Sequence, residues 1–280
     1  MTRQSLESEI AAAKAVAARA GLGQVAPEVL KLAEHTTLRL TPLPIVARIR
    51  SKEFSSESLT RELAVAKYLA TRGAPAVRPT SNVEAGPYIE NGCAITLWEF
   101  SVGRAVETEA DATMTAKALQ QVHHALCGFD RDLPSFIGAV ETCETILANP
   151  GESPKLRASD RLFLERLYAR LRQELDNRDL ACRPIHGDTH LANVLITESG
   201  AVWMDLEAVC LGPLEWDVIT LPRIARSQFK GVDANLMRFL ADVRSLCVAT
   251  WCWADYDRST DIREAAIHHL DALKTRFGCA

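Results

Sequence analysis

Residues 184–196, PIHGDTHLANVLI, place a histidine, an aspartate and an asparagine directly before an apolar run. A second stretch, AVWMDLEAV at 201–209, carries another aspartate at the end of a second apolar run. The residues between them, 198–200, read Glu-Ser-Gly, which is typical of a turn, so the two runs predict a β-hairpin. A hairpin of this length returns Asp205 to the neighbourhood of Asn193.

The polar side chains of this hairpin are the types that phosphoryl transfer uses. Asn193 and Asp205 can share a hard cation through oxygen ligands, as Mg²⁺ prefers, and Asp188 can receive a proton from a bound hydroxyl. Two other interpretations stay open. Aspartate and asparagine are common turn residues, and His186, Asp188 and His190 are also of types that bind iron or zinc. The metal interpretation is disfavoured because no third imidazole or thiolate has suitable spacing.

A cation with a carboxylate partner is found in the first third of the chain. In IVARI, residues 45–49, Arg48 alternates with apolar neighbours, as a strand residue on one face would. Fourteen residues later, Glu62 lies in a helical pattern that Ser55 or Ser56 can cap. A cation held by a helix carboxylate and directed at phosphates would complete the same machinery. Taken alone, these two residues are better explained as a surface ion pair.

The order of the elements predicts an α+β fold. An amphipathic helix ends at Gly21, strand patterns follow over 28–50 and 93–100, and the pattern from residue 111 onward is mostly helical. The predicted hairpin interrupts this helical part. A short junction between the two unlike parts is a usual position for a ligand cleft.

Composition limits the partners. The chain has 280 residues, 48% of them hydrophobic, and a formal net charge of −4, which argues against nucleic acid or an anionic membrane as a partner. No apolar run approaches the about 18 residues of a membrane span, and no export signal is seen, so we expect a cytoplasmic protein. The eight cysteines contain no Cys-x-x-Cys pair and are expected to be structural thiols. The sequence leaves monomer and homodimer open.

Three motifs, HGDTHLANVL, WMDLEAV and GPLEWDV, make the sequence resemble the aminoglycoside phosphotransferase and choline kinase superfamily, relatives of protein kinases. The resemblance implies a bilobal protein-kinase-like fold. Its N-terminal lobe, 1–97, would hold the first helix, a small antiparallel sheet and the helix that carries Glu62. A hinge, 98–103, would lead to a helical C-terminal lobe, 104–280, that contains the catalytic hairpin, 184–207.

The resemblance also implies roles for individual residues. Asp188 would be the catalytic base, and Asn193 and Asp205 would hold Mg²⁺ that bridges to ATP. Arg48, paired with Glu62, would contact the inner phosphates. His186 and Asp217 would support the catalytic loop. The adenine would contact the junction backbone at Trp98, Glu99 and Phe100.

The tip of the first hairpin departs from protein kinases. Residues 33–36 read Ala-Glu-His-Thr and contain no glycine, whereas protein kinases cover the phosphates with a glycine-rich loop. Glu34 would repel phosphate if it pointed inward. Backbone amides or the Thr36 hydroxyl are then left to hold the outer phosphate.

The acceptor is the least determined part of the prediction. The stretch 249–261 is aromatic and acidic, which suits a cationic acceptor such as an aminoglycoside or a quaternary amine. A core tryptophan and a solvated helix end are nevertheless the favoured explanation of this stretch. The candidate acceptor-binding residues are Glu207, Trp253, Asp255 and Asp257.

We therefore expect Mg²⁺-dependent transfer of the γ-phosphate of ATP or GTP to a hydroxyl of a small molecule, with antibiotics, and so antibiotic resistance, among the candidates. A non-catalytic, nucleotide-binding regulatory module is the alternative, which the glycine-free tip favours. A protein kinase is disfavoured because only twelve residues separate 205 from 217, too few for a peptide platform.

Overall fold

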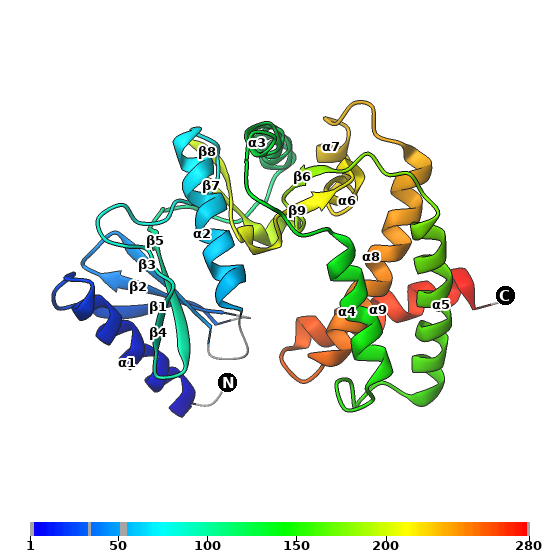
Figure 1. Ribbon diagram of the computed structural model, residues 1–280, viewed down its shortest axis with the longest axis horizontal. Helices are drawn as coiled ribbons and strands as arrows, with labels where there is room; N and C mark the ends of the chain where they lie inside the picture. Colours follow the sequence, from blue (N-terminus) through cyan, green and yellow to red (C-terminus); the bar gives the residue numbers. More distant parts are fainter. Residues whose placement is uncertain (1–2, 33–34, 51–54, 279–280) are drawn as a thin grey trace. The chain divides into compact units, whose positions relative to one another are not determined.

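The computed structural model describes residues 3–32, 35–50 and 55–278, and these form two compact units (Figure 1). The first unit comprises Met1–Asp130 and His190–Val209, and the second comprises Arg131–Thr189 and Cys210–Ala280. Each unit has a hydrophobic core of its own.

The first unit is built on a five-stranded antiparallel sheet of order β1-β2-β3-β5-β4. Its strands are β1 (Ala26–Leu32), β2 (Thr36–Thr41), β3 (Ile45–Arg50), β4 (Tyr88–Glu90) and β5 (Cys93–Glu99). Side chains alternate between buried and partly exposed along β2 and β3, because successive strand residues point to opposite faces. One face therefore carries Leu38, Ala47 and Ile49, and the other carries Arg48.

Two helices accompany this sheet (Figure 1). The helix α1 (Arg3–Arg19) packs its alanine and valine residues against the buried face, where Val16 joins the core that contains Leu38 and Ile95. The helix α2 (Ser56–Thr71) begins after Ser55, whose hydroxyl accepts a hydrogen bond from the amide of Ser58 (3.3 Å). Both helices occur where the sequence predicts them.

The predicted hairpin is present in the first unit. It consists of β7 (Val194–Thr197) and β8 (Gly200–Trp203), with Val194 paired to Trp203 and Thr197 paired to Gly200. The short helix η1 (Leu191–Asn193) precedes it and η2 (Leu206–Ala208) follows it.

The hairpin is anchored to the first unit through Trp203. Its amide donates to the carbonyl of Pro75 (2.9 Å), its carbonyl accepts from the amide of Val77 (2.8 Å), and its indole donates to Thr115 of α3 (Glu109–Leu126) at 3.3 Å. The two units consequently differ from the lobes that the sequence predicts. Residues 104–130 and 190–209, expected in the C-terminal lobe, pack with the first unit because α3 and the hairpin contact each other.

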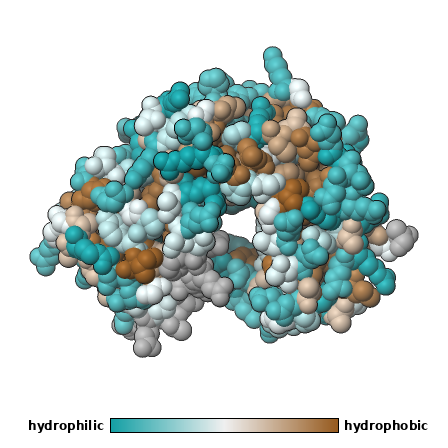
Figure 2. Space-filling model, in the orientation of Figure 1, coloured by the Kyte–Doolittle hydropathy of each residue, from teal (hydrophilic) through white to brown (hydrophobic). Residues whose placement is uncertain are grey.

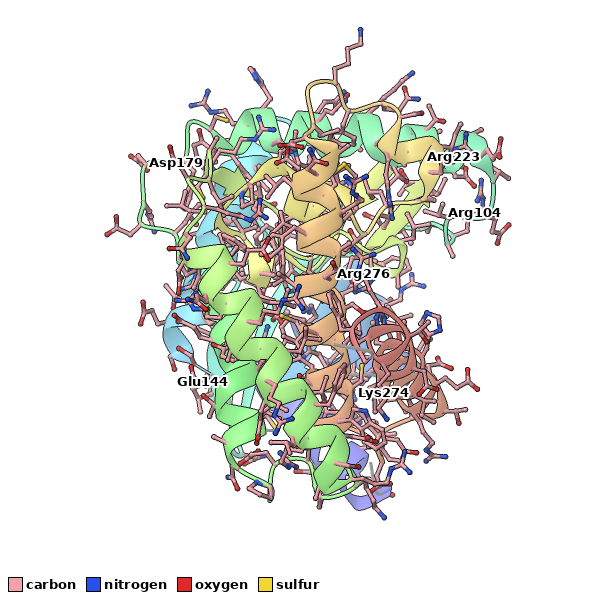
Figure 3. All side chains as sticks on the ribbon, turned by 90° about the vertical axis from the view of Figure 1, so that its right-hand side faces the viewer. Arg104, Glu144, Asp179, Arg223, Lys274 and Arg276 are labelled. Atoms are coloured by element: carbon pink, nitrogen blue, oxygen red, sulfur yellow. The ribbon has the colours of Figure 1, made fainter. Side chains whose placement is uncertain are left out.

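The second unit is mainly helical, and its long helices share one core of leucine, valine and aromatic residues. Its helices are α4 (Ile137–Ala148), α5 (Ala158–Asp176), α6 (Leu214–Val218), α7 (Arg223–Arg226), α8 (Ala234–Ala254) and α9 (Thr260–Phe277). Two short strands, β6 (Arg183–Ile185) and β9 (Cys210–Gly212), pair antiparallel beside them. Arg276 of α9, labelled in Figure 3, donates to Asp242 of α8 (2.9 Å).

Figure 2 shows one face of each unit. Hydrophilic residues cover most of it, and hydrophobic residues are scattered among them. Cys143 and Cys247 are fully buried in the second core, as expected for structural thiols. Among the described residues, no helix combines the length and the hydropathy that a membrane crossing requires.

Candidate active site

A cavity of about 340 Å³ opens in the first unit, between the exposed face of the sheet and the hairpin. This volume lies within the range of small-molecule sites, which is roughly 300–1,000 Å³. The residues that line it are Leu30, Lys31, His35, Thr37, Val46, Arg48, Val77, Trp98, Glu99, Phe100, Ser101, Ala192, Asn193, Leu195, Met204 and Asp205.

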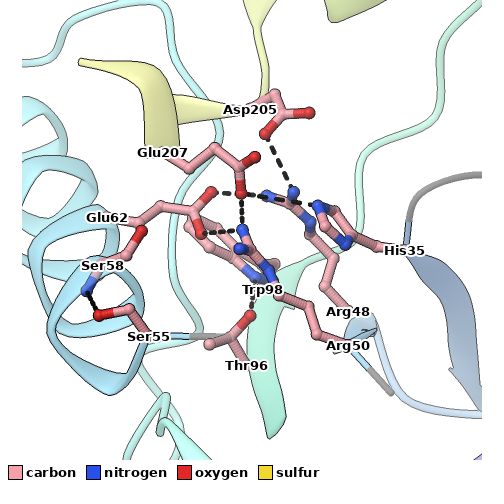
Figure 4. Close-up of polar contacts among 10 residues, drawn as sticks. All are labelled: His35, Arg48, Arg50, Ser55, Ser58, Glu62, Thr96, Trp98, Asp205 and Glu207. Carbon is pink, nitrogen blue, oxygen red and sulfur yellow. Dashed lines mark hydrogen bonds and ion pairs between the residues drawn. The ribbon is translucent and has the colours of Figure 1, made fainter. Parts of the chain in front are cut away.

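Arg48 is held between two carboxylates in this cavity (Figure 4). Its Nη1 donates to Oε1 of Glu62 at 2.6 Å, and its Nη2 donates to Oδ1 of Asp205 at 3.0 Å. Burial by itself lowers the pKa of Arg48, but the charges of Glu62 and Asp205 outweigh burial and raise the pKa above its ordinary value. Arg48 is therefore a fixed, permanently charged cation that faces the cavity.

Glu62 is positioned by α2. The Ser55 cap fixes the start of the helix, and Glu62, on its buried side, is only 1% exposed. Besides Arg48, its carboxylate lies 3.7 Å from Nη2 of Arg50, which is on the same face of β3 two residues later. The ion pair expected between Arg48 and Glu62 is thus formed and largely shielded from water, which strengthens the Coulomb attraction between the two charges.

Asp205 and Asn193 lie at the two open ends of the hairpin strands and line the same cavity. Asn193 is 5% exposed, and its carbonyl accepts from the amide of Met204 at 2.8 Å. Asp205 adopts the left-handed conformation (φ 61°, ψ 65°), which costs about 1 kcal/mol or more for a residue with a side chain. The strained backbone turns the chain directly after β8 and presents the carboxylate to Arg48.

Glu207 was expected as an acceptor contact, but it belongs to this charged cluster in the first unit. It forms an ion pair with Arg50, and its Oε2 lies 3.5 Å from Nε2 of His35 (Figure 4). Ligand atoms of His35, Asp205 and Glu207 lie within 4.8 Å of one another. Neither Arg50 nor His35 was predicted as a site residue, although the position of Arg50 two residues after Arg48 on a strand would have placed it on the same face.

The junction residues Trp98, Glu99 and Phe100 line the cavity as well. The amide of Glu99 donates to Arg78 (2.8 Å), and the amide of Phe100 donates to Pro44 (2.9 Å). Both amides are therefore already hydrogen-bonded within the protein.

At the hairpin tip, Thr36 is buried at the start of β2, whereas Lys31, His35 and Thr37 line the cavity. Ala33 and Glu34, also named in the sequence analysis, lie outside the described residues.

In the second unit, the loop that carries Asp188 is held by α6. The carboxylate of Asp217 accepts from the amides of His186 and Gly187, each at 2.8 Å, and the carbonyl of Asp217 accepts from the Thr189 hydroxyl at 2.5 Å. The ring of His186 is fully buried, and its Nδ1 accepts weakly from the amide of Asp188 (3.4 Å). These bonds fix the loop backbone on both sides of Asp188.

Asp188 also has a side-chain partner that the sequence did not indicate. Arg244 of α8 forms an ion pair with Oδ1 of Asp188 and donates to the carbonyl of Gly187 at 3.1 Å. The two side chains are 56 residues apart, and Arg244 lies in no recognisable motif. No local pattern could therefore have revealed the pair.

The aromatic and acidic residues expected at the acceptor site lie at the far end of α8. Trp253 is 9% exposed and stacks on Tyr256, with ring centroids 4.6 Å apart, and Asp255 pairs with Arg258 at 2.9 Å. Asp257 is exposed. Asp255, the C-terminal cap of α8, lies eleven positions after Arg244, which corresponds to about 16 Å at 1.5 Å per residue. These residues therefore lie away from Arg244, the α8 residue that contacts the Asp188 loop.

The sheet with its buried Arg–Glu pair, the metal-ligand types on the hairpin and the helical second unit define the class, a kinase-like phosphotransferase. The model of the phosphotransferase enzyme family, abbreviated APH, matches residues 31–247, and the chain belongs to this family. It is thus a small-molecule kinase, and the predicted superfamily is confirmed. No match to the sequence was found among curated proteins.

Solved structures with the same fold confirm the predicted fold class. The amicoumacin kinase hAmiN, in complex with AMP-PNP, Ca²⁺ and Ami, has a TM-score of 0.73 at 14% identity, with coverage of 99% of this chain and 97% of that chain. Choline kinase LicA from Streptococcus pneumoniae has a TM-score of 0.69 at 12% identity (96% and 99% covered). The GDP and kanamycin complex of APH(2")-IIia has a TM-score of 0.66 at 12% identity (94% and 97% covered).

Proposed function

We propose that this phosphotransferase moves the γ-phosphate of ATP or GTP to a hydroxyl of a small molecule in the presence of Mg²⁺. The observation that carries the proposal is the guanidinium of Arg48, fixed between Glu62 and Asp205 in a cavity that Asn193 also lines. A permanent cation beside oxygen ligands is what binding of a metal–nucleotide complex requires.

The donor types in the cavity fit a hard divalent cation. The carboxylate of Asp205 and the carboxamide of Asn193 supply oxygen atoms, which Mg²⁺ prefers over nitrogen or sulfur. These two residues would hold the ion, which would neutralise charge on the phosphates. Arg48, which pairs with Asp205 here, would contact the inner phosphates and stay anchored by Glu62.

The tip of the first hairpin offers side chains for the outer phosphate. Lys31 and His35 line the cavity where a glycine-rich loop would supply backbone amides. We propose that these two side chains hold the outer phosphate, and that the bulk of Trp98 and Phe100 contacts the base.

Asp188 would orient the acceptor hydroxyl and accept its proton. Its loop is held by Asp217 and His186 through backbone hydrogen bonds, so the carboxylate is presented from a rigid segment. A positioned general base typically contributes about 10²- to 10⁴-fold to the rate.

The acceptor we propose is a hydroxylated small molecule, with antibiotics and amino alcohols as the first candidates. Amicoumacin, kanamycin and choline appear in the names of structures that share the fold. A non-catalytic nucleotide-binding module is the second candidate, and the glycine-free tip at 33–36 is the observation that favours it.

The test is a coupled ADP-release screen with aminoglycosides, other hydroxylated antibiotics, choline-like amines and sugars as acceptors. We expect at least one compound to stimulate ADP release, and Asp188→Ala to lower that rate by about 100-fold or more with ATP affinity largely retained. Asp179→Ala is the matched control, because Asp179 is an exposed aspartate of the same unit, labelled in Figure 3.

If the protein binds ATP but releases no ADP with any acceptor of the screen, the non-catalytic module is the favoured function. Equal loss of ATP affinity in Asp188→Ala would contradict the catalytic assignment.

A further inference from the structure

We propose that Arg244 is a positioning residue that fixes the carboxylate of Asp188 in the direction in which it orients the acceptor hydroxyl and accepts its proton, an inference that rests on the proposed function. Arg244 approaches the loop from α8 and contacts two consecutive residues. One nitrogen pairs with Oδ1 of Asp188, and the other donates to the carbonyl of Gly187 at 3.1 Å. The planar guanidinium thereby sets both the backbone and the side chain of the loop.

The guanidinium is itself held in place by two indoles. The Arg244 carbon Cζ lies 5.1 Å from the ring centroid of Trp216 and 5.5 Å from that of Trp251. Each indole is fixed by a hydrogen bond of its own, from Trp216 to Gly187 (3.2 Å) and from Trp251 to Thr142 (2.8 Å). Two cation–π contacts and a side chain only 13% exposed distinguish Arg244 from a mobile surface arginine.

The consequence for Asp188 is geometric. A carboxylate whose Oδ1 is engaged by a fixed guanidinium cannot rotate freely about its Cβ–Cγ bond, so the direction of Oδ2 is fixed as well. Phosphoryl transfer depends on in-line positioning of the nucleophile, and a displacement of about 1 Å can cost roughly 100-fold in rate. Asp217 holds the loop through the amides of His186 and Gly187 and through the Thr189 hydroxyl. The contact of Arg244 with Oδ1 therefore gives Arg244 a role in orienting the carboxylate.

The experiment measures ADP release in Mg²⁺ with saturating ATP, with the best acceptor of the screen or with water, for Arg244→Ala, Arg244→Lys and Asp188→Ala. We expect Arg244→Ala to lower kcat by about 10- to 100-fold with the Kd for ATP unchanged within about twofold, because Arg244 acts on orientation alone. Lysine keeps the positive charge but lacks the planar guanidinium that donates to both loop residues. The kcat of Arg244→Lys should therefore lie between those of Arg244→Ala and the wild type. Arg238→Ala, an exposed arginine of the same helix, is the control for substitution in α8.

Two readouts separate positioning from a merely structural role. Added guanidinium at a non-denaturing concentration should restore part of the kcat of Arg244→Ala and none of that of Asp188→Ala. In the double variant, Arg244→Ala should have almost no further effect on the Asp188→Ala rate, since residues that act as a unit are non-additive.

Additive losses in the double variant, or a wild-type kcat in folded Arg244→Ala, would overturn the role of Arg244 while the proposed function stands. If Arg244→Ala does not fold, an unchanged kcat in Arg244→Lys overturns it equally. Absence of ADP release by the wild type with every acceptor would overturn the proposed function, and the role of Arg244 with it.

Discussion

Arg48 illustrates how one side chain sets the chemistry of the cavity. Its two terminal nitrogens are used separately, one for Glu62 at 2.6 Å and one for Asp205 at 3.0 Å. An arginine fork can satisfy two carboxylates at once, whereas the single ammonium of a lysine is a compact point charge. The fork explains why an arginine at this position can remain bound to α2 and still face the hairpin.

We predict that Arg48→Lys weakens ATP binding about 10-fold, equivalent to roughly 1.4 kcal/mol, because a lysine cannot keep both the Glu62 contact and a phosphate contact. Isothermal titration of ATP in Mg²⁺ measures the change. The matched control is Arg61→Lys in the same unit, where Arg61 lies 3.9 Å from the exposed Glu57. Equal Kd values for the wild type and Arg48→Lys would show that Arg48 does not contact the nucleotide.

Site residues that belong to a strand, helix or hairpin pattern could be predicted from the sequence. Site residues that are defined only by tertiary contacts could not. Arg48 and Glu62 follow from strand and helix periodicity, and Asn193 and Asp205 follow from the hairpin. Arg244 reaches Asp188 from a helix that begins 46 residues after it, and no local pattern reports such a contact. The acidic stretch at 255–257 follows the last residue of α8, and its composition alone does not say whether this end of the helix faces an acceptor.

Among the elements, α5 and α9 are joined by a shielded ion pair. Asp160, in the first turn of α5, accepts from Nζ of Lys274 on α9 at 2.7 Å and from Arg157 at 3.1 Å. Burial raises the pKa of Asp160, but Lys274 and Arg157 outweigh it and the pKa lies below its ordinary value of 3.8. The pair therefore stabilises the folded state at neutral pH.

We predict that Asp160→Asn lowers the free energy of unfolding by about 1–2 kcal/mol at pH 7. Because the folded pKa lies below the unfolded one, the stabilisation is fully present above the unfolded pKa, near 4, and is lost as pH falls through the folded pKa. Thermal unfolding from pH 7 to pH 3 should show the gap between wild type and variant narrowing below about pH 4. Asp176→Asn, which removes an exposed pair with Arg172 on the same helix, should change little at any pH. A constant gap down to pH 3 would contradict this account.

Long elements could be predicted from periodicity, whereas the four-residue strands β7 and β8 were predicted from the turn that joins them. Strands of six or seven residues and helices of sixteen or more show their periodicity and were placed correctly. The three-residue strands β4, β6 and β9 are too short to repeat a pattern even twice. The start of α3 was expected at Asp111 and occurs at Glu109, because Thr108 is the cap and Asp111 is its partner in the capping box.

For the whole molecule, the cavity and the Asp188 loop belong to different compact units, since the hairpin packs with the sheet-containing unit. The sequence could predict two parts of unlike composition, but the assignment of 190–209 depends on the hydrogen bonds of Trp203 to Pro75 and Val77. Boundaries of this kind are set by tertiary packing and have no marker in composition.

We predict that ATP with Mg²⁺ slows amide hydrogen exchange in β3, β7 and β8 and leaves the buried amides of α5 and α8 unchanged. The reason is that a bound ligand raises the free energy of opening of the segments that hold it. Hydrogen-exchange mass spectrometry measures both sets in one experiment, and Arg48→Ala, which should lose the effect, is the control. Protection of α5 without protection of β7 and β8 would place the nucleotide elsewhere.

The most direct test of the account is ADP release by the wild type and by Asp205→Asn, with Mg²⁺ and with EDTA. Asparagine keeps the size of residue 205 and removes the charge, so the account predicts that Asp205→Asn turns over at least about 100-fold more slowly and that EDTA abolishes the wild-type rate. Glu198→Gln, an exposed acid at the other end of the same hairpin, should behave like the wild type. A wild-type rate in Asp205→Asn, or turnover that persists in EDTA, would contradict the account.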